Sequence, residues 1–280
     1  MLRETTPQLR GVLAEDGSVV PLFFYPLLSE SGMVTHAFTT RLGGASGGMF
    51  SSMNLSFTRG DKKEDVEENF RRLARALAVD YGSFVFSCQT HTTNVVRVGK
   101  KDAGNGIIKE QKFADVDGLI TNERGVTLVT FFADCVPLYF VDPVHGAIGL
   151  SHSGWRGTVG RMGKVTLEKM KQEFGTDTAD VLCAVGPSIC QSCYEVGGEV
   201  AEVFAAEFAG HEQEILAETG NGTYHLNLWR ANEIVLTEAG VKREHLSVTD
   251  VCTCCNPALL FSHRASKGRR GNLAAVLALR

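Results

Sequence analysis

The chain has 280 residues, of which 44% are hydrophobic and 21% charged, so it can bury a substantial core and lacks the composition of a disordered protein. Its net charge of −4 and isoelectric point of about 6.1 argue against a nucleic-acid-binding surface. The longest apolar run, Gly125–Val141, is interrupted by Asp134 and Pro137, so we expect no membrane span. Residues 1–10 are polar, so we expect no signal peptide, and eight cysteines then indicate the reducing cytoplasm.

In the first half of the chain, alternating apolar and polar residues predict strands on both sides of a glycine-rich loop, Arg41–Gly48. That loop is either a mobile turn or a phosphate cradle, although it lacks the Walker spacing and its lysine. A helix capped by Asp61 is expected over Asp61–Val79, because its apolar residues repeat at a spacing of three to four. The predicted strands are Val19–Phe24, Val34–Phe38, Val85–Cys88, Val95–Val98, Gly118–Thr121, Val126–Phe132, Leu138–Val141 and Ala147–Ser151.

The last four of these strands have no amphipathic helix between them, which favours an antiparallel or mixed sheet over repeated βαβ units. A helix from about Thr158 to Phe174 follows, closed by Gly175. The remaining predicted elements are the strand Val181–Val185, the helices Gly198–Phe208 and Leu228–Ala239, and the strands Leu246–Val251 and Asn272–Leu279. Because no repeat or linker interrupts the pattern, we predict an α+β fold in which helices flank mixed β-sheet in a single domain over residues 1–280.

Three of the β-rich runs lead into short segments with metal-binding side chains: CQTH at 88–91, ADC at 133–135 and HSGWRG at 152–157. Two imidazoles and one thiolate suit Zn²⁺, and three protein ligands leave a fourth position for water or substrate. We therefore predict a zinc site on His91, Cys135 and His152, although each histidine taken alone could be a buried structural residue. His145 should face away from His152 on a regular strand, so it is not expected to be a ligand.

Cys135 also permits a second interpretation, in which it is a thiolate nucleophile and His152 is its general base. Asp134 would then orient the histidine, as in cysteine hydrolases. The two interpretations share Cys135 and His152, and they differ in whether His91 completes a metal site.

Three arginines, Arg41, Arg156 and Arg264, stand among glycines or serines, where a guanidinium could bind phosphate or carboxylate. Surface solubility is the competing explanation for each of them. We expect Ser262 to Arg264 to return to the metal site. Two cysteine groups remain, Cys190 with Cys193, and Cys252 with Cys254 and Cys255. The first has CxxC spacing, but CxCC is not its usual partner, so we predict buried thiols in preference to a second Zn or Fe–S site.

Together these motifs resemble those of the bacterial laccase-domain family, in the right order from about Thr39 to the C-terminus. The motifs that carry the resemblance are CQTH, FADC, HSGWRG, GPSI followed by CYEVG, and CT followed by FSHR. Members of this family have been called polyphenol oxidases, purine nucleoside phosphorylases and, in some bacteria, a peptidoglycan editing factor. The sequence departs from the family pattern at Asn227, where an Asp is usual, and at Arg270–Asn272, which reads RGN where TGR is usual.

The resemblance implies zinc on His91, Cys135 and His152, and phosphorolysis of adenosine, inosine and methylthioadenosine with adenosine deamination as a side activity. It also implies a compact sandwich with some likeness to the toxin-type cysteine hydrolase fold. On this view Arg41 or Arg156 would hold phosphate, Arg264 would contact an anion, and Asp134 would move protons during deamination. The partners would be a small nucleoside and phosphate, without nucleic acid or membrane, and the sequence does not determine the oligomeric state.

Two other enzymatic functions and one binding function stay open. A hydrolase could edit a peptidoglycan precursor, and a non-enzymatic zinc protein could serve as a binding partner. Multicopper laccases build a trinuclear copper cluster from His-x-His pairs, and none of the eight histidines here has a partner two residues away. A single Cu at the predicted site could still support oxidation of polyphenols, so copper remains an alternative metal.

Overall fold

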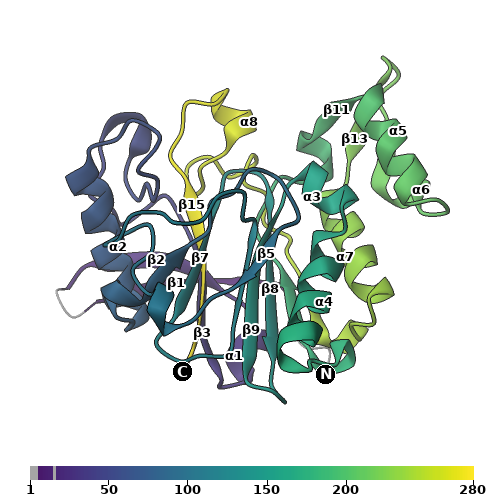
Figure 1. The fold of residues 1–280 in the computed structure, drawn as a ribbon. Helices are drawn as coiled ribbons and strands as arrows, with labels where there is room; N and C mark the ends of the chain where they lie inside the picture. The colour runs from purple at the N-terminus through teal and green to yellow at the C-terminus, as the bar shows by residue number, and fades with distance from the viewer. Residues whose placement is uncertain (1–5, 15–16) are drawn as a thin grey trace.

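The computed structural model describes residues 6–14 and 17–280 (Figure 1). The signal-peptide prediction was based on residues 1–10, of which residues 1–5 lie outside the described part of the chain. Two six-stranded sheets pack face to face, and helices cover the outer face of each. The predicted α+β class, with helices flanking mixed sheets, is confirmed. Within the described ranges, no helix combines the length and the apolar character needed to cross a membrane.

The first sheet has the order β1-β2-β3-β15-β7-β4 and is antiparallel except for the parallel pair of β4 and β7. Its strands are β1 (Gln8–Leu13), β2 (Val19–Phe24), β3 (Val34–Thr39), β4 (Phe84–Phe86), β7 (Thr127–Phe132) and β15 (Leu273–Leu279). The C-terminal strand β15 lies between β3 and β7, so the last residues of the chain complete the middle of this sheet. Helix α2 (Lys63–Leu77) covers the outer face through Val66, Phe70 and Leu73.

The second sheet has the order β14-β10-β8-β9-β6-β5, with parallel pairs at its two edges. Its strands are β5 (Val95–Arg97), β6 (Gly118–Thr121), β8 (Val136–Asp142), β9 (Ala147–Ser153), β10 (Leu182–Val185) and β14 (Leu246–Val248). Helices α4 (Met162–Phe174) and α7 (Leu228–Glu238) cover its outer face, where Leu167 and Met170 are fully buried. The core between the two sheets joins residues such as Phe38 of β3 to Tyr139 of β8.

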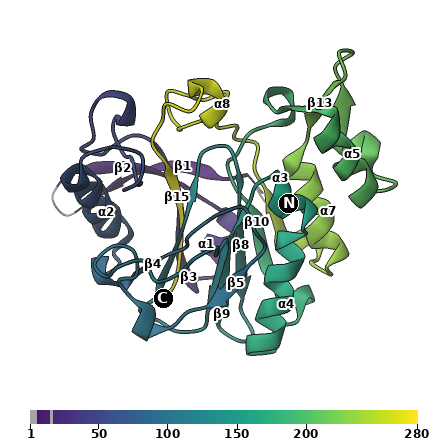
Figure 2. The same cartoon turned by 45° about the horizontal axis from the view of Figure 1, so that its top comes forward.

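A small third sheet and its helices extend from one end of the sandwich. It consists of β11 (Glu195–Gly197), β13 (Thr223–Leu226) and β12 (Leu216–Glu218), beside α5 (Gly198–Glu207) and α6 (Glu212–Ile215). Short helix α8 (His263–Ser266) lies at the same end of the molecule in both views (Figures 1 and 2). The remaining helix is α1 (Pro26–Glu30), and single 3-10 turns span Gly48–Phe50, Tyr81–Ser83, Lys100–Asp102, Thr178–Asp180, Gln191–Cys193 and Arg243–His245.

Two predicted features of the helices are wrong. The helix expected from Thr158 to Phe174 is two helices, α3 (Trp155–Val159) and α4, because Arg161 between them adopts the left-handed conformation at φ +55°. Asp61 does not cap α2, since Lys62 occupies the capping position and one Asp61 oxygen accepts the Asn54 side-chain amide at 2.9 Å. The predicted helix end at Gly175 is confirmed.

Candidate metal centre

Three side chains that could hold a metal ion meet where strand β8 begins and strand β9 ends, at one end of the second sheet. The antiparallel register places Val136 beside Ser153 and Pro137 beside His152, so Cys135, just before β8, comes next to His152 near the end of β9. His91 reaches the same point from the loop between β4 and β5. The ligand atoms of His91, Cys135 and His152 all lie within 4.8 Å of one another, and the two imidazole rings have centroids 5.0 Å apart.

A buried carboxylate, Asp117, organises both histidines. One of its oxygens accepts the His152 Nδ1 at 2.8 Å and the His91 backbone N–H at 3.1 Å. The other accepts the N–H groups of Thr90 at 3.1 Å and Thr92 at 2.9 Å, and the Thr92 hydroxyl at 2.9 Å. Since Nδ1 of His152 is engaged, Nε2 is the nitrogen left for a metal, an arrangement typical of histidine ligands. Asp117 has no solvent exposure, and the sequence analysis missed it.

The charges in this group depend on one another. Burial alone would raise the pKa of the Cys135 thiol, but the neighbouring His152 and His91 lower it to about 6. Burial would lower the pKa of His152, but Cys135 and Asp117 raise it to about 9. The pKa of Asp117 is lowered despite its burial, chiefly by His152. The group therefore favours a thiolate beside a positive charge, which a bound cation can supply in place of a proton. A soft thiolate with two imidazoles fits a transition metal.

The backbone around these ligands is unusually constrained. A side chain at Gly154 would place its Cβ 3.0 Å from the Cys135 Sγ and 3.1 Å from the His91 Cδ2, so only glycine leaves both ligands undisturbed. His91 has φ +66° and Asp134 has φ +88°, both in the left-handed region that residues with side chains rarely adopt. Such conformations concentrate at functional sites, where the surrounding structure holds them in place.

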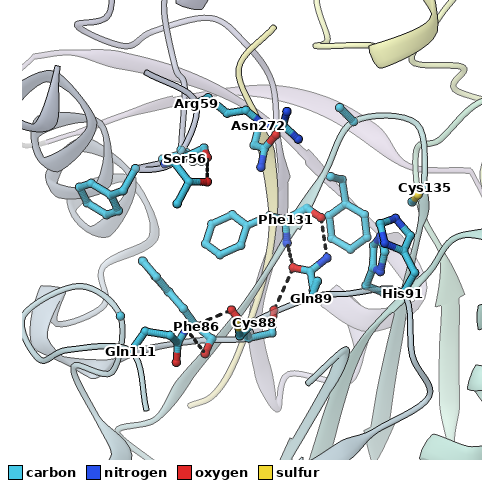
Figure 3. A pocket seen from close by; sticks show the side chains of 18 of the residues that line it. Ser56, Arg59, Phe86, Cys88, Gln89, His91, Gln111, Phe131, Cys135 and Asn272 are labelled. Atoms are coloured by element: carbon cyan, nitrogen blue, oxygen red, sulfur yellow. Dashed lines mark hydrogen bonds between the residues drawn. The ribbon is translucent and has the colours of Figure 1, made fainter. Parts of the chain in front are cut away.

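The three ligands lie at one end of a cavity of about 450 Å³, which is large enough for a small organic ligand. Figure 3 shows Phe131 between His91 and Cys135 on one side and Phe86 and Gln111 on the other. The rings of Phe86 and Phe131 pack edge to face, with their centroids 5.1 Å apart and their planes at 89°. The cavity thus joins the metal ligands to an aromatic surface.

Two arginines, Arg59 and Arg270, line the same cavity. Arg270 is only 8% exposed, and burial, followed by the charge of Arg59, lowers its pKa to about 10. Its Nη1 donates to the Gly271 carbonyl and the Asn272 side chain, while its buried Nε has no partner among the residues that the structure describes. Among the described residues, neither arginine forms an ion pair with a carboxylate. Two guanidinium groups without carboxylate partners in one cavity are chemically suited to bind an anion.

The three arginines predicted from the sequence do not line this cavity. Arg41 donates to the carbonyls of Ser51 at 2.9 Å and Pro257 at 2.8 Å. Arg156 lies over the Trp155 ring at 4.3 Å. Arg264 donates its guanidinium to two backbone carbonyls, at 3.2 Å and 3.0 Å. The sequence analysis missed Arg59, and it treated Arg270 only as a departure from the family pattern. Only the folded chain reveals that these two arginines share a cavity.

The segment Ser262 to Arg264 does return to the site, as predicted, but through its backbone. The Arg264 N–H donates to one oxygen of Asp134 at 2.7 Å, and the Thr253 hydroxyl donates to the other at 2.6 Å. The interpretation in which Asp134 orients His152 is wrong, because Asp117 makes that contact. His145 lies away from the ligands, as predicted, but for a different reason. It is in the turn before β9, where its Nδ1 bonds Asp142 at 2.9 Å, and is therefore not on the same strand as His152.

Comparison with known proteins places the chain in a family. Residues 35–280 match the family model described as multi-copper polyphenol oxidoreductase laccase, and the chain belongs to this laccase-domain family, as its motifs predicted. A protein from Geobacillus stearothermophilus named purine nucleoside phosphorylase YlmD is 39% identical over 246 residues, covering 86% of this chain and 89% of that protein.

Two further comparisons agree with this family. A protein from an unknown prokaryotic organism named adenosine deaminase RL5 is 34% identical over 230 residues, covering 81% of this chain and 87% of that protein. The crystal structure of YlmD from Geobacillus stearothermophilus superposes with a TM-score of 0.86 at 35% sequence identity, covering 97% of this chain and 100% of that chain. These relatives thus bear the names of enzymes that act on purine nucleosides.

Proposed function

We propose that this protein is a zinc-dependent purine nucleoside phosphorylase acting on adenosine, inosine and methylthioadenosine, as a single catalytic domain in the cytoplasm. The observation that carries the proposal is the cavity of about 450 Å³ that joins three potential metal ligands, an aromatic surface and two arginines without acidic partners among the described residues. A purine nucleoside and a phosphate ion together need these three kinds of contact. The names of the relatives point to the same substrates.

His91, Cys135 and His152 would hold the metal, with Asp117 fixing the tautomer of His152. We favour zinc because one thiolate and two neutral imidazoles are typical zinc ligands, and three protein ligands keep a position open, as catalytic zinc sites do. The ion would supply Lewis-acid chemistry next to the bound substrate.

We assign phosphate to Arg59 and Arg270. Their guanidinium groups would hold the dianion near the anomeric carbon of the nucleoside, in a cavity whose described lining residues include no carboxylate to compete with it. As the bond from the sugar carbon to the purine nitrogen breaks, a phosphate oxygen forms a new bond to that carbon. The purine leaves with the electron pair and takes up a proton, which gives the free base and ribose 1-phosphate. Holding both reactants in one cavity lowers the barrier by removing the cost of bringing them together.

Phe131 would stack on the purine base, and Phe86 packs perpendicular to the Phe131 ring. Gln89 keeps Phe131 in place, because its side-chain amide bonds both backbone groups of that residue, accepting the N–H at 2.7 Å and donating to the carbonyl at 2.8 Å (Figure 3). The proposed base-binding surface is therefore held by the backbone of β7, an interior strand of the first sheet between β15 and β4.

We keep adenosine deamination as a proposed side activity, in keeping with the name of the RL5 relative. Both oxygens of Asp134 accept hydrogen bonds from other residues, so we assign this residue a positioning role. It would hold the segments of Thr253 and Arg264 next to Cys135. Its left-handed backbone turns the chain sharply at that point.

A cysteine hydrolase, such as one that edits a peptidoglycan precursor, is the second candidate. The observation in its favour is the order Asp117–His152–Cys135, which matches a carboxylate, a general base and a nucleophile. That mechanism leaves His91 and both cavity arginines without a role, which is why we favour the metal enzyme. Alkylation with iodoacetamide separates the two. The metal enzyme should have Cys135 protected until a chelator removes the ion, whereas a nucleophile should react at the same rate in both states.

The proposal is tested by comparing His91→Ala with His145→Ala. The first variant should lose one equivalent of zinc and nucleoside phosphorolysis together, and the second should keep both, because His145 lies away from the ligands. Elemental analysis and chromatographic detection of the free base provide the measurements. Unchanged metal content in His91→Ala, or copper in place of zinc in the purified protein, would contradict the proposal.

A further inference from the structure

Four cysteines outside the proposed active site come together from two separate loops. Strands β10 and β14 are parallel neighbours, so their carboxyl ends lie at the same edge of the sheet. The loop after β10 carries Cys190 and Cys193, and the loop after β14 carries Cys252 and Cys255. A parallel bridge between Ser188 and Cys252 holds the two loops side by side.

The four sulfur atoms have the spacing of ligands around one ion. All four lie within 4.8 Å of one another, with Cys190 to Cys255 at 3.9 Å and Cys193 to Cys255 at 3.4 Å. In a tetrahedral site with zinc–sulfur bonds of about 2.3 Å, sulfur atoms stand about 3.8 Å apart. All the cysteines of the chain are free thiols, so these distances do not arise from disulfides. The spacing suits a single ion, because the thiolates of an iron–sulfur cluster bind different irons and stand further apart.

The backbone also favours negative charge at the buried sulfur. The N–H groups of Cys190 and Cys255 both point at the Cys252 Sγ, at 3.3 Å and 3.4 Å. Hydrogen bonds of this kind orient and stabilise thiolate ligands of metal ions. Cys252 is buried, Cys190 and Cys193 are partly buried and Cys255 is exposed, so an ion can enter from solvent.

The sequence analysis predicted buried thiols here, and the structure contradicts that prediction for all of these residues except Cys252. Its error was to treat the second group as CxCC. Cys252 and Cys255 themselves have CxxC spacing, as do Cys190 and Cys193. Two CxxC pairs are the usual ligand pattern of structural zinc sites.

We propose that Cys190, Cys193, Cys252 and Cys255 bind a second zinc ion, which is structural and separate from the proposed catalytic metal. With four protein ligands the site is closed, so it has no position for substrate. The proposal does not depend on the phosphorylase activity. The ion would fasten the loop that leads into β11 and α5 to the loop that leads toward α8.

By holding these two loops together, the second ion would also affect the first metal site, through Asp134. Thr253, next to Cys252, donates its hydroxyl to Asp134, and the Arg264 guanidinium donates to the carbonyls of Cys193 and Glu195. The second ion would therefore fix the segments that contact the residue preceding Cys135. Its removal should loosen this end of the molecule while leaving the first metal bound.

The test is metal analysis of purified protein and three serine variants. Wild-type protein should hold about two zinc ions per chain. Cys193→Ser and Cys255→Ser should each lose one, while Cys254→Ser, the matched control in the same loop, should keep both. His91→Ala should lose the other ion, so a double variant with Cys193→Ser should hold none. Equal zinc content in wild type, Cys193→Ser and Cys255→Ser would overturn the proposal, as would loss of zinc in Cys254→Ser or iron in place of zinc.

A measurement on unaltered protein guards against variants that fail to fold. Iodoacetamide labelling, mapped by mass spectrometry, should spare Cys193 and Cys255 until a chelator is added, whereas labelling of Cys254 should not change. Cobalt substitution should give the strong sulfur-to-metal charge-transfer absorption of a four-thiolate site, and this absorption should survive His91→Ala. Rapid labelling of Cys255 in protein that holds full zinc would contradict the assignment.

Discussion

Replacing Asp117 by asparagine should disable the metal centre without removing any ligand. Three donors point at one oxygen of Asp117, the amide groups of Thr90 and Thr92 and the Thr92 hydroxyl. The new side chain should therefore place its oxygen there and turn its NH₂ toward His152. An NH₂ group facing Nδ1 favours the imidazole tautomer that carries its proton on Nε2, and Nε2 is the atom that must be free to bind a metal.

The size of the effect follows from the two hydrogen bonds that the substitution breaks. Changing a partner that orients a metal-binding histidine typically lowers metal affinity by about 10- to 100-fold, or about 1.4–2.8 kcal/mol. The His91 N–H loses its acceptor as well, because it shares the oxygen that bonds His152. A buried donor left unpaired costs about 1–3 kcal/mol, so the metal-free variant should also unfold more easily by that amount.

The assay is competition of the purified variant with a zinc chelator of known affinity, followed by urea unfolding of the metal-free forms. Asp115→Asn is the matched control, since within the described residues the Asp115 side chain bonds only the Thr90 hydroxyl, and Asp115 lies two residues from Asp117. Asparagine also tolerates the left-handed backbone at that position, φ +53°. Equal zinc affinity in the Asp117 and Asp115 variants would refute the claim that Asp117 sets the tautomer of His152.

Three further predictions concern the cavity, the ligand loop and the core. Arg270→Gln should raise the KM for phosphate about 10- to 100-fold, as loss of a charge-assisted hydrogen bond implies, whereas Arg41→Gln, outside the cavity, should not. Gly154→Ala should weaken zinc binding in chelator competition, because its Cβ would crowd Cys135. Burial lowers the pKa of His36 from 6.5 to about 4. The stability that neutral His36 gives the folded protein is therefore fully present above pH 6.5 and is lost as the pH falls toward 4. Between these values wild-type protein should lose about 3 kcal/mol more stability than His36→Gln in urea unfolding.

Each of these has an outcome that contradicts it. An unchanged KM for phosphate in Arg270→Gln would remove the anion site from the cavity. Full zinc affinity in Gly154→Ala would show that the backbone at residue 154 can shift without disturbing Cys135 and His91. Parallel pH profiles for wild type and His36→Gln would mean that His36 is protonated to the same extent in the folded and unfolded states.

The sequence predicted those features that depend on local pattern. The four strands from β6 to β9 were found because each is an apolar run bounded by turn residues, and the lack of helices between them predicted an antiparallel or mixed sheet. Strands β6 and β8 do pair antiparallel with β9, but β7 belongs to the other sheet, where it pairs with β15 and β4. His91, Cys135 and His152 were found because each follows such a run. The strands β11 to β13 were missed because they are only three or four residues long, too short to show an alternating pattern. The break before α4 was missed because Arg161 adopts a left-handed conformation, held by ion pairs with Glu207 and Glu238.

The other site residues could not be predicted because their roles arise from distant parts of the chain. Asp117 matters only because the loop at residues 90–92 folds around its carboxylate. Arg59 and Arg270 are more than 200 residues apart and meet because the C-terminal strand β15 completes the first sheet beside β7. Arg41 and Arg264 do lie in glycine- and serine-rich segments, but their guanidinium groups bond backbone carbonyls.

The central claim is that the cavity brings a nucleoside and phosphate together beside a metal held by His91, Cys135 and His152. The most direct test is to incubate purified protein with adenosine, with and without phosphate, and to follow adenine, ribose 1-phosphate and inosine together. We predict adenine and ribose 1-phosphate in equal amounts, formed only with phosphate and abolished in His91→Ala, with inosine as a minor product. Adenine released with free ribose in the absence of phosphate, or no cleavage of adenosine, inosine or methylthioadenosine by protein with full metal content, would contradict it.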